Sequence, residues 1–399
     1  MRRWLFRLFS LAVLLFFVAC AAVWLLEVYP RYGSHPPLKL AKGILAIEHA
    51  RIYVSPADPP IDDGTLLVRD GLIAAVGKQV EVPQDATIVP CDHCVVTAGF
   101  WNAHVHLTEP KWSFANWKPA ATLNPQLSDM FLSRGFTTVI DLGSNPADTF
   151  SIRRRIEKGE LNGPDIYSAG SALYPPHGVP FYLRETLPGW VVWLLPQPDS
   201  PDQASRIVRR NLASGADLTK LFTGSWVRRG QVLPMPVRIA GAAATETHLN
   251  GKLVFAHPSN LAGLQVAINK NMAMIPTLKM FATTVTTDSH YMDPICAEVQ
   301  QFHQLGGTLI FGTDVGYMPD YTTDLEFVEL GKSGLDWKTV LAMLTTNPAA
   351  RMGVSASKGT LTPGKLADIT ILDADPADAL TNFSRVLAVV RSGRVVWQR

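Results

Sequence analysis

Short apolar runs alternate with helical stretches through the middle of this 399-residue chain, and this alternation constrains the fold more than any other feature. Such alternation is typical of parallel sheets and barrels, because parallel neighbours need a long crossover connection. The expected strands are residues 95–106, 137–142, 165–168, 218–222, 252–257, 272–278 and 308–314. The pattern predicts an α/β fold with a TIM-type (β/α) barrel over residues 95–358.

Both flanks of this middle part have strand-type patterns instead. The expected strands there are residues 44–53, 65–69, 72–76 and 87–89 on one side, and residues 369–372, 386–391 and 394–397 on the other. Asp62-Asp63-Gly64 and Asp70-Gly71 separate the first of these, and Asp-Gly between two alternating runs is a strong hairpin signal. We therefore predict one small composite β-sandwich domain from residues 44–94 and 359–399.

The N-terminus carries an uncharged apolar run over residues 8–26, preceded by Arg2, Arg3 and Arg7. A helix of this run spans roughly 28 Å, close to the hydrocarbon core of a bilayer. Basic residues before the run favour a cytoplasmic N-terminus and an exported body, periplasmic or extracellular. The sequence predicts an N-terminal transmembrane signal anchor over residues 1–29 and a linker over 30–43. A cleaved signal peptide and a lipoprotein are alternatives that also export the body.

Charge and cysteine content exclude two classes of protein. Lys and Arg number 36 against 34 Asp and Glu, and a net charge of +2 predicts no nucleic-acid partner. Four cysteines are too few and too scattered for a disulfide framework. Cys91 and Cys94 have the C-x-x-C spacing, but no second pair exists to complete a zinc site. We interpret this segment as a turn before the next strand.

Several of the expected barrel strands end in ionisable residues, and a TIM barrel places its chemistry at these carboxyl ends. His104 and His106 stand two apart on one strand, so both side chains point to the same face and can bind one metal ion. Buried histidines that only form hydrogen bonds are the alternative. His257 and Asp314 end two later strands, and Asp314 could bind metal and accept a proton from water.

Lys220 lies within an otherwise apolar strand. A buried lysine is unfavourable unless it is paired or neutral, although its long side chain could instead reach the rim of the barrel. A neutral lysine amine can also add carbon dioxide, and the resulting carbamate can bridge two metal ions. The position of Lys220 is compatible with either arrangement.

Taken together, these motifs resemble the amidohydrolase superfamily, in the branch of imidazolonepropionase-like and Xaa-Pro dipeptidase-like enzymes. The resemblance extends from about residue 44 to the C-terminus. It rests on the strands that carry His104 and His106, Lys220, His257 and Asp314, and on the segments 345–353 and 359–369. Ala98 and Asn102 depart from the family pattern, which usually has Pro and often Asp there, but neither change removes a metal ligand.

The resemblance implies a metal-dependent hydrolase of carbon–nitrogen bonds other than peptide bonds, which uses one or two divalent ions, with zinc the first choice. His104 and His106 would bind the more buried ion, and Lys220, as its carbamate (carboxylysine), would bridge to a second ion held by His257. Asp314 would be both metal ligand and catalytic base. The implied substrates are small amides or dipeptide-like molecules, and His177, in a loop, is a candidate substrate-binding residue.

One departure from the family is large. The family places a further metal-binding histidine at the end of its sixth barrel strand. Here residues 261–270 predict a single helix after His257, and residues 272–278 already resemble the seventh strand. Only 57 residues separate His257 from Asp314. Because a βα unit needs roughly 30 residues, the strand-six unit is missing.

The missing unit leaves two functions open. The first is an active amidohydrolase, and the second is a catalytically impaired or inactive amidohydrolase-fold binding protein that has lost its second metal site. His248, His290 and His303 lie on or near helices, so we do not expect them to replace the missing ligand. A deletion confined to this sequence is a third explanation. The sequence indicates neither the substrate nor the oligomeric state.

Overall fold

The computed structural model describes residues 2–23, 38–257, 272–284, 288 and 290–399. The predicted helix over residues 261–270 and most of the predicted linker lie outside this part of the chain. The apolar N-terminal run forms α1 (Arg2–Val23). The predicted transmembrane anchor is not supported, because no helix among the described residues is both long and apolar enough to cross a membrane. The predicted span continued to residue 26, and residues 24–26 are not described.

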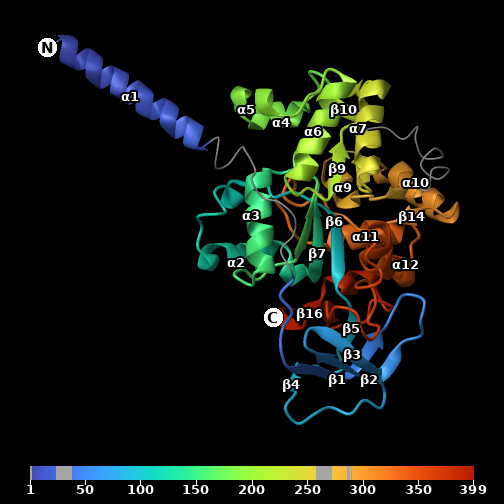
Figure 1. The fold of residues 1–399 in the computed structure, drawn as a ribbon. Helices are drawn as coiled ribbons and strands as arrows, with labels where there is room; N and C mark the ends of the chain where they lie inside the picture. The colour runs from blue at the N-terminus through green and yellow to red at the C-terminus, as the bar shows by residue number, and fades with distance from the viewer. Residues whose placement is uncertain (1, 24–37, 258–271, 285–287, 289) are drawn as a thin grey trace.

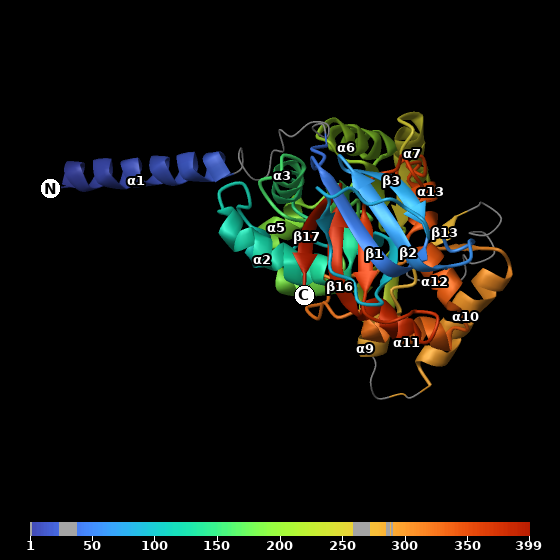
Figure 2. The same ribbon diagram turned by 90° about the horizontal axis from the view of Figure 1, so that it is seen from below.

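Both ends of the remaining chain join in one eight-stranded sheet, and Figure 1 and Figure 2 show the two ends side by side. The order is β17-β16-β15-β5-β1-β2-β3, and β4 pairs with β1. The strands are β1 (Ile44–Tyr53), β2 (Ile61–Arg69), β3 (Leu72–Gly77), β4 (Thr87–Ile88), β5 (Val95–Ala98), β15 (Ile369–Leu372), β16 (Val386–Arg391) and β17 (Arg394–Gln398). The strands expected as a sandwich thus form a single hydrogen-bonded sheet, which we call the terminal sheet.

Alternate residues of these strands build a core that both ends share. Ile47 and Ile52 of β1, Val96 of β5, Ile371 of β15 and Val390 of β16 are buried in one apolar cluster. An apolar side chain at every second position is what a strand needs to bury one face. The two chain ends therefore stabilise each other through packing as well as through hydrogen bonds.

One tight turn in the sheet follows the expected chemistry, and one expected break between strands does not occur. Asp70 and Gly71 have φ values of +50° and +83°, and both positive values match the turn that favours Asp-Gly in a hairpin. Asp62-Asp63-Gly64, expected to separate strands, lies inside β2. Register shifts in the β1–β2 pairing near Ala50 accommodate this segment as an irregular strand.

The strand expected over residues 95–106 is divided at Gly99 into β5 and β6 (Phe100–Val105). A Cβ atom at Gly99 would lie 2.2 Å from Oγ1 of Thr137, so only glycine allows this close approach. The Gly99 N–H donates a hydrogen bond to the Asp368 carbonyl. The chain therefore leaves the terminal sheet after β5. With β6 it enters the part of the molecule made of alternating strands and helices, which we call the α/β body.

Parallel strands form the centre of the α/β body (Figure 1). They are β6, β7 (Phe136–Asp141), β8 (Asp165–Ser168), β9 (Leu218–Leu221), β12 (Leu253–Ala256), β13 (Ala273–Met274) and β14 (Thr308–Leu309). The pairs β6–β7, β7–β8, β9–β12 and β13–β14 are parallel. The Asp217 N–H bonds to the Ser168 carbonyl between β8 and β9, and the Ala103 N–H bonds to the Phe311 carbonyl between β6 and the segment after β14.

Helices surround these strands, as expected of βα units (Figure 1). They are α2 (Ala120–Met130), α3 (Pro146–Glu157), α6 (Pro201–Ala213), α7 (Val237–Leu249), α9 (Leu278–Thr284), α10 (Met292–Gln304), α11 (Asp324–Lys332), α12 (Trp337–Leu344) and α13 (Thr346–Arg351). Two short helices, α4 (Phe181–Thr186) and α5 (Gly189–Leu194), lie near a hairpin of β10 (Gly224–Arg228) and β11 (Gln231–Pro234). The strand expected over 272–278 is shorter, because Leu278 begins α9.

The strands do not close into a complete ring within the described part of the chain. β12 pairs with β9 and β13 pairs with β14, but no pairing joins β12 to β13. Every residue of β6 and β7 is buried, whereas no residue of β12 or β13 is. The gap lies at the position of the strand-six unit that the sequence spacing predicts to be missing.

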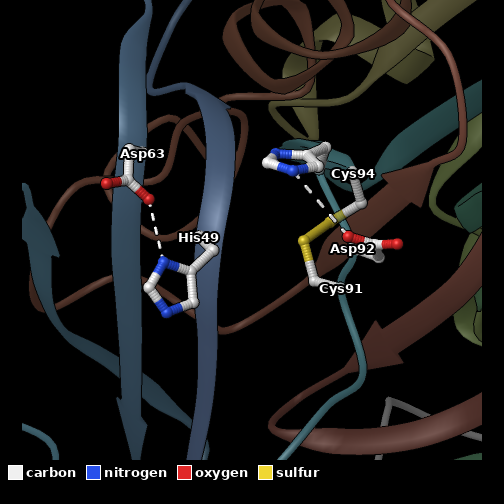
Figure 3. The surroundings of a disulfide bond; sticks show 6 residues. His49, Asp63, Cys91, Asp92 and Cys94 are labelled. Carbon is white, nitrogen blue, oxygen red and sulfur yellow. Dashed lines mark hydrogen bonds and ion pairs between the residues drawn. A yellow bond between two sulfur atoms is a disulfide. The ribbon is translucent and has the colours of Figure 1, made fainter.

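A disulfide joins Cys91 and Cys94 in the segment directly before β5 (Figure 3). Our interpretation of this segment as a plain turn missed the bond, because a lone C-x-x-C pair does not reveal its oxidation state. Asp92 and His93, inside the short loop, are exposed, and His49 pairs with Asp63 nearby at 2.9 Å. Among the described cysteines, Cys20 and Cys296 are free.

Candidate metal centre

His104 on β6, His106 directly after β6, and a carboxylate from the segment after β14 converge at the carboxyl end of the parallel strands. His104 and His106 present their rings 5.3 Å apart between centroids. Asp314 follows β14, and its own N–H donates to the His104 carbonyl at 2.9 Å. Gly316 continues this segment against the His106 carbonyl oxygen, where a Cβ would lie only 1.7 Å away. The backbone therefore fixes Asp314 next to both rings.

The side-chain atoms of these three residues lie within metal-binding distance of one another. Oδ1 of Asp314 is 3.0 Å from Nε2 of His106 and 3.4 Å from Nε2 of His104. One possible ligand atom from each of the three residues lies within 4.8 Å of the other two. Oδ1 is buried, yet neither nitrogen donates a hydrogen bond of good geometry to it. Two imidazoles and a carboxylate that meet in this way form a set of ligands that suits zinc.

Burial and charge set the protonation states that such a site needs. Burial lowers the pKa of His104 well below its ordinary value, although the Asp314 carboxylate opposes this. Burial alone would raise the pKa of Asp314, but His104 and His106 lower it below its ordinary value. A neutral imidazole and an ionised carboxylate are the metal-binding forms of these groups.

Asp141 is a buried carboxylate at the end of β7, and it acts on His106 through the turn at Gly143. It accepts hydrogen bonds from the Gly143 N–H at 3.3 Å, from Thr149 Oγ1 at 3.0 Å and from Ser168 Oγ at 3.2 Å. The carbonyl of Gly143 in turn lies 3.4 Å from Nδ1 of His106. Burial raises the pKa of Asp141, and His106 and these hydrogen bonds oppose the rise. Asp141 thus holds the turn that orients His106, a role that sequence reasoning missed.

Asn102 ties the two ligand-bearing strands together. Its Nδ2 donates to Oγ1 of Thr313 at 2.7 Å, and its Oδ1 accepts from the Thr313 N–H at 3.2 Å. The same Oδ1 lies 3.3 Å from the His104 backbone nitrogen. Asn102 thus donates one hydrogen bond to Thr313 and accepts another from it, and an Asp at this position could only accept, with the Thr313 hydroxyl as the donor.

Lys220 points into the body and not toward solvent. It lies on β9 and is 2% exposed, which argues against the rim position considered from the sequence. Burial lowers the pKa of Lys220 to about 8, and the Asp314 carboxylate opposes this shift. Its Nζ atom lies 5.7 Å from the centroid of the Phe222 ring. The amine is therefore buried and electrostatically linked to the candidate centre.

His257 borders the gap directly after β12. Its ring stacks on Phe222 with centroids 4.9 Å apart, and its backbone N–H donates a hydrogen bond to the Leu221 carbonyl. Burial lowers the pKa of His257 to about 4, and the positive charge of Lys220 adds to the effect. His257 is therefore near Lys220, but it is not one of the three clustered residues.

The remaining histidines behave differently from these. His177 is exposed in the turn from Pro175 to Gly178, so its predicted substrate role stays a prediction. His248, His290 and His303 are all exposed, which agrees with the expectation that helix histidines do not replace the missing ligand.

The molecule thus combines an α/β body with a candidate metal centre at the carboxyl end of its parallel strands, and comparison with known proteins gives the family. The sequence model of the amidohydrolase family matches residues 233–396. Ochratoxinase from Aspergillus niger is 21% identical over 426 residues, which cover 89% of this chain and 85% of ochratoxinase. The alignment is longer than the 89% of 399 residues that this chain contributes to it. It therefore contains positions where ochratoxinase has residues and this chain has none. The chain belongs to the amidohydrolase superfamily.

Solved structures share the fold over almost the whole chain. A Xaa-Pro dipeptidase with bound methionine in the active site superposes with a TM-score of 0.72 and 19% identity, over 90% of this chain and 100% of that one. A prolidase complexed with N-methylphosphonate-L-proline gives a TM-score of 0.72 and 20% identity over the same shares. At these identities the likeness shows the fold alone.

Proposed function

We propose that this protein is a metal-dependent hydrolase that cleaves amide-type carbon–nitrogen bonds in small, dipeptide-like molecules. The convergence of His104, His106 and Asp314 on one buried point carries the proposal. The substrate class follows from the chain's similarity to proteins named prolidase, Xaa-Pro dipeptidase and ochratoxinase. Family membership supports hydrolysis but does not select the substrate, because variable loops determine specificity on such folds.

Each residue of the centre has a role that its surroundings favour. A bound divalent ion such as zinc polarises a carbonyl group and makes water a stronger acid. His104 and His106 would hold that ion through Nε2, in orientations supported by Asn102 and by the turn that Asp141 fixes. Asp314 stays ionised, so its carboxylate can hold the ion and accept the proton of the attacking water.

Lys220 and His257 would support a second, weaker ion. A buried amine with a lowered pKa is neutral more often than an exposed one, and the neutral amine is the form that adds carbon dioxide. The carbamate of Lys220 and the imidazole of His257 give only two protein ligands, whereas catalytic zinc sites usually have three. We therefore propose one tightly bound ion and one weak or absent ion per chain.

A second candidate function is a catalytically impaired or inactive binding protein with the same fold. The observation that favours it is the gap between β12 and β13 beside His257. A protein of this kind would keep the fold and lose turnover. Metal content and hydrolysis together distinguish the two functions.

Elemental analysis of the purified full-length protein, after titration with zinc or manganese, tests the proposal. We expect about one tight ion, loss of that ion in His104→Asn and Asp314→Asn, and no change in the exposed control His290→Asn. The metal-loaded protein should hydrolyse N-acyl amino acids or Xaa-Pro dipeptides. Binding of no ion would overturn the metal centre, and one tight ion without hydrolysis of any amide would favour the binding protein.

We further propose that the body is exported. The Cys91–Cys94 disulfide supports this, because such bonds persist in oxidising compartments and are rare in the cytosol. The apolar N-terminal run preceded by arginines also supports it. Thiol labelling of freshly fractionated cells, with and without reductant, is the test. Finding Cys91 and Cys94 as free thiols in a cytosolic fraction would contradict export.

A further inference from the structure

Two tyrosine rings lie beside the candidate metal centre, and sequence reasoning assigned neither a role. Tyr317 comes three residues after Asp314, and its N–H donates to the Asp314 carbonyl at 3.2 Å. Tyr182, on α4, comes from a distant part of the chain, yet its ring lies 5.1 Å from that of Tyr317 at an angle of 56°. Tyr317 is 46% exposed, so this pair presents aromatic surface to solvent next to a buried carboxylate.

The Asp314 carboxylate acts electrostatically on the Tyr182 phenol. Burial raises the pKa of the Tyr182 phenol, and Tyr174 and the Asp314 carboxylate raise it further. The phenol therefore stays protonated as a hydrogen-bond donor, and its contact with Tyr317 joins it to the segment that carries Asp314. Because Asp314 holds the proposed ion, Tyr182 and Tyr317 are next to the place where a scissile bond would lie.

A second group of stacked rings lies near Lys220. Tyr174 stacks on Phe222 with centroids 4.6 Å apart, and Phe222 stacks on His257. Tyr174 and Phe222 are buried, and we regard them as the fixed support of this region. Tyr182 and Tyr317 are less buried, and they are the rings that remain available to a bound molecule.

The backbone around Tyr182 is fixed at several points. Arg184 donates to the Val227 carbonyl of β10, and Ser225 donates to the Gly178 carbonyl at 2.5 Å. The Tyr174 N–H donates to the Pro196 carbonyl beyond α5 at 2.9 Å. Because the backbone of this segment is already fixed by hydrogen bonds, the Tyr182 ring loses little conformational entropy when a ligand binds. A residue that determines specificity needs this kind of preorganisation.

We propose that Tyr182 and Tyr317 form an aromatic subsite that binds a planar aromatic group of the substrate beside the scissile carbon–nitrogen bond. This inference rests on the proposed function, and it specifies the substrate class for the same centre. Aromatic rings prefer offset or edge-to-face contact with other rings, and the tilted Tyr182–Tyr317 pair offers both a face and an edge. Aliphatic groups of small size would gain less from these rings.

Binding of two matched acids to the metal-loaded full-length protein tests the subsite without turnover. 3-Phenylpropionate carries a phenyl ring that butyrate lacks, and neither contains an amide. By calorimetry we expect at least tenfold tighter binding of the aromatic acid. Tyr182→Ala should reduce that preference to less than threefold, and Tyr182→Phe should keep it. Trp193→Ala is the matched control, because Trp193 lies on neighbouring α5 and is 79% exposed.

Turnover then separates this inference from the proposed function. For N-acetyl-phenylalanine and N-acetyl-alanine we expect the same preference in kcat/KM, with the same dependence on Tyr182. Equal binding of both acids, or an aromatic preference unchanged in Tyr182→Ala, overturns the subsite. Aromatic preference in binding without hydrolysis of these amides or of Xaa-Pro dipeptides supports the subsite and overturns the proposed hydrolase.

Discussion

The two sides of the α/β body differ in a way that bears directly on its chemistry. On one side, β6 and β7 are buried along their whole length, and β6 is bonded to both of its neighbours. On the other side, β12 has a neighbour only in β9 among the described strands, and its last residue is exposed. His104, His106 and Asp314 come from the first side, and His257 comes from the second.

This difference indicates that the two sides of the body would hold a metal ligand with unequal support from the backbone. On the first side, β6 has a bonded neighbour on each side, and the Asp314 N–H bonds to the carbonyl of His104 on that strand. On the second side, His257 follows β12, and its backbone N–H bonds to Leu221, in the single neighbour that β12 has among the described strands. We therefore expect the first side to dominate metal binding, turnover and stability.

Removal of the base should have the largest effect. Asp314→Asn keeps the size of the side chain but removes its charge, and we expect kcat/KM to fall by about 1,000-fold or more. His257→Asn, on the open side, should lower kcat/KM by about tenfold or less, because the weak second ion contributes less. Steady-state kinetics with one amide substrate gives both numbers. Equal losses in the two variants would mean that both sides matter equally.

Metal affinity should depend on the support behind His106. Asp141→Asn keeps the acceptor oxygen but removes the charge that holds the Gly143 turn, and we expect zinc affinity to fall by about 10–100-fold. Competition with a chromophoric chelator measures this. Asp63→Asn serves as the control, since Asp63 is an exposed carboxylate of the terminal sheet. An unchanged affinity would show that the turn does not need Asp141.

Packing should differ between the two sides by a smaller amount. Val139→Ala, at a fully buried site of β7, should lower the free energy of unfolding by about 2 kcal/mol. Val254→Ala, at a half-buried site of β12, should lower it by less than about 1 kcal/mol. Urea denaturation of the two variants at one pH makes the comparison. A larger loss at Val254 would show that something covers the open side.

The smallest effect concerns the pH dependence of stability in metal-free protein. The pKa of His257 is lowered to about 4, mainly by burial, so the folded state binds its proton less readily than the unfolded state does. Stability is therefore lost as the pH falls from about 6.5 toward 4. His257→Gln should lose less stability over this range in urea denaturation. Parallel curves for the two proteins would show that His257 is not buried as a neutral ring.

Much of the terminal sheet could be predicted from the sequence. The bounds of β1, β15 and β16 match the expected ranges, because alternation and turn residues are local signals. The break at Gly99 could not be predicted, since it depends on contact with Thr137 from another strand. The predicted break between strands at Asp63 and Gly64 was wrong for a related reason. Their pairing with β1 is irregular, and this irregular pairing accommodates residues that usually end a strand.

The candidate centre followed from the sequence only in part. His104, His106 and Asp314 were predicted because strand ends meet at one face of a barrel. The supporting bonds of Asp141 and Asn102 are long-range, and no local pattern marks them. Tyr182 was also missed, because its approach to Tyr317 depends on how α4 lies over the body.

The terminal sheet has a consequence for how the chain is made. β15 pairs with β5, and the Phe100 N–H bonds to Thr370, 270 residues later. During synthesis, the sheet of β1, β2 and β5 therefore keeps an unpaired edge at β5 until β15 has left the ribosome. Contacts of such separation slow folding, and a waiting edge is prone to aggregation. We expect nascent chains that stop before residue 369 to depend on chaperones and to be degraded rapidly.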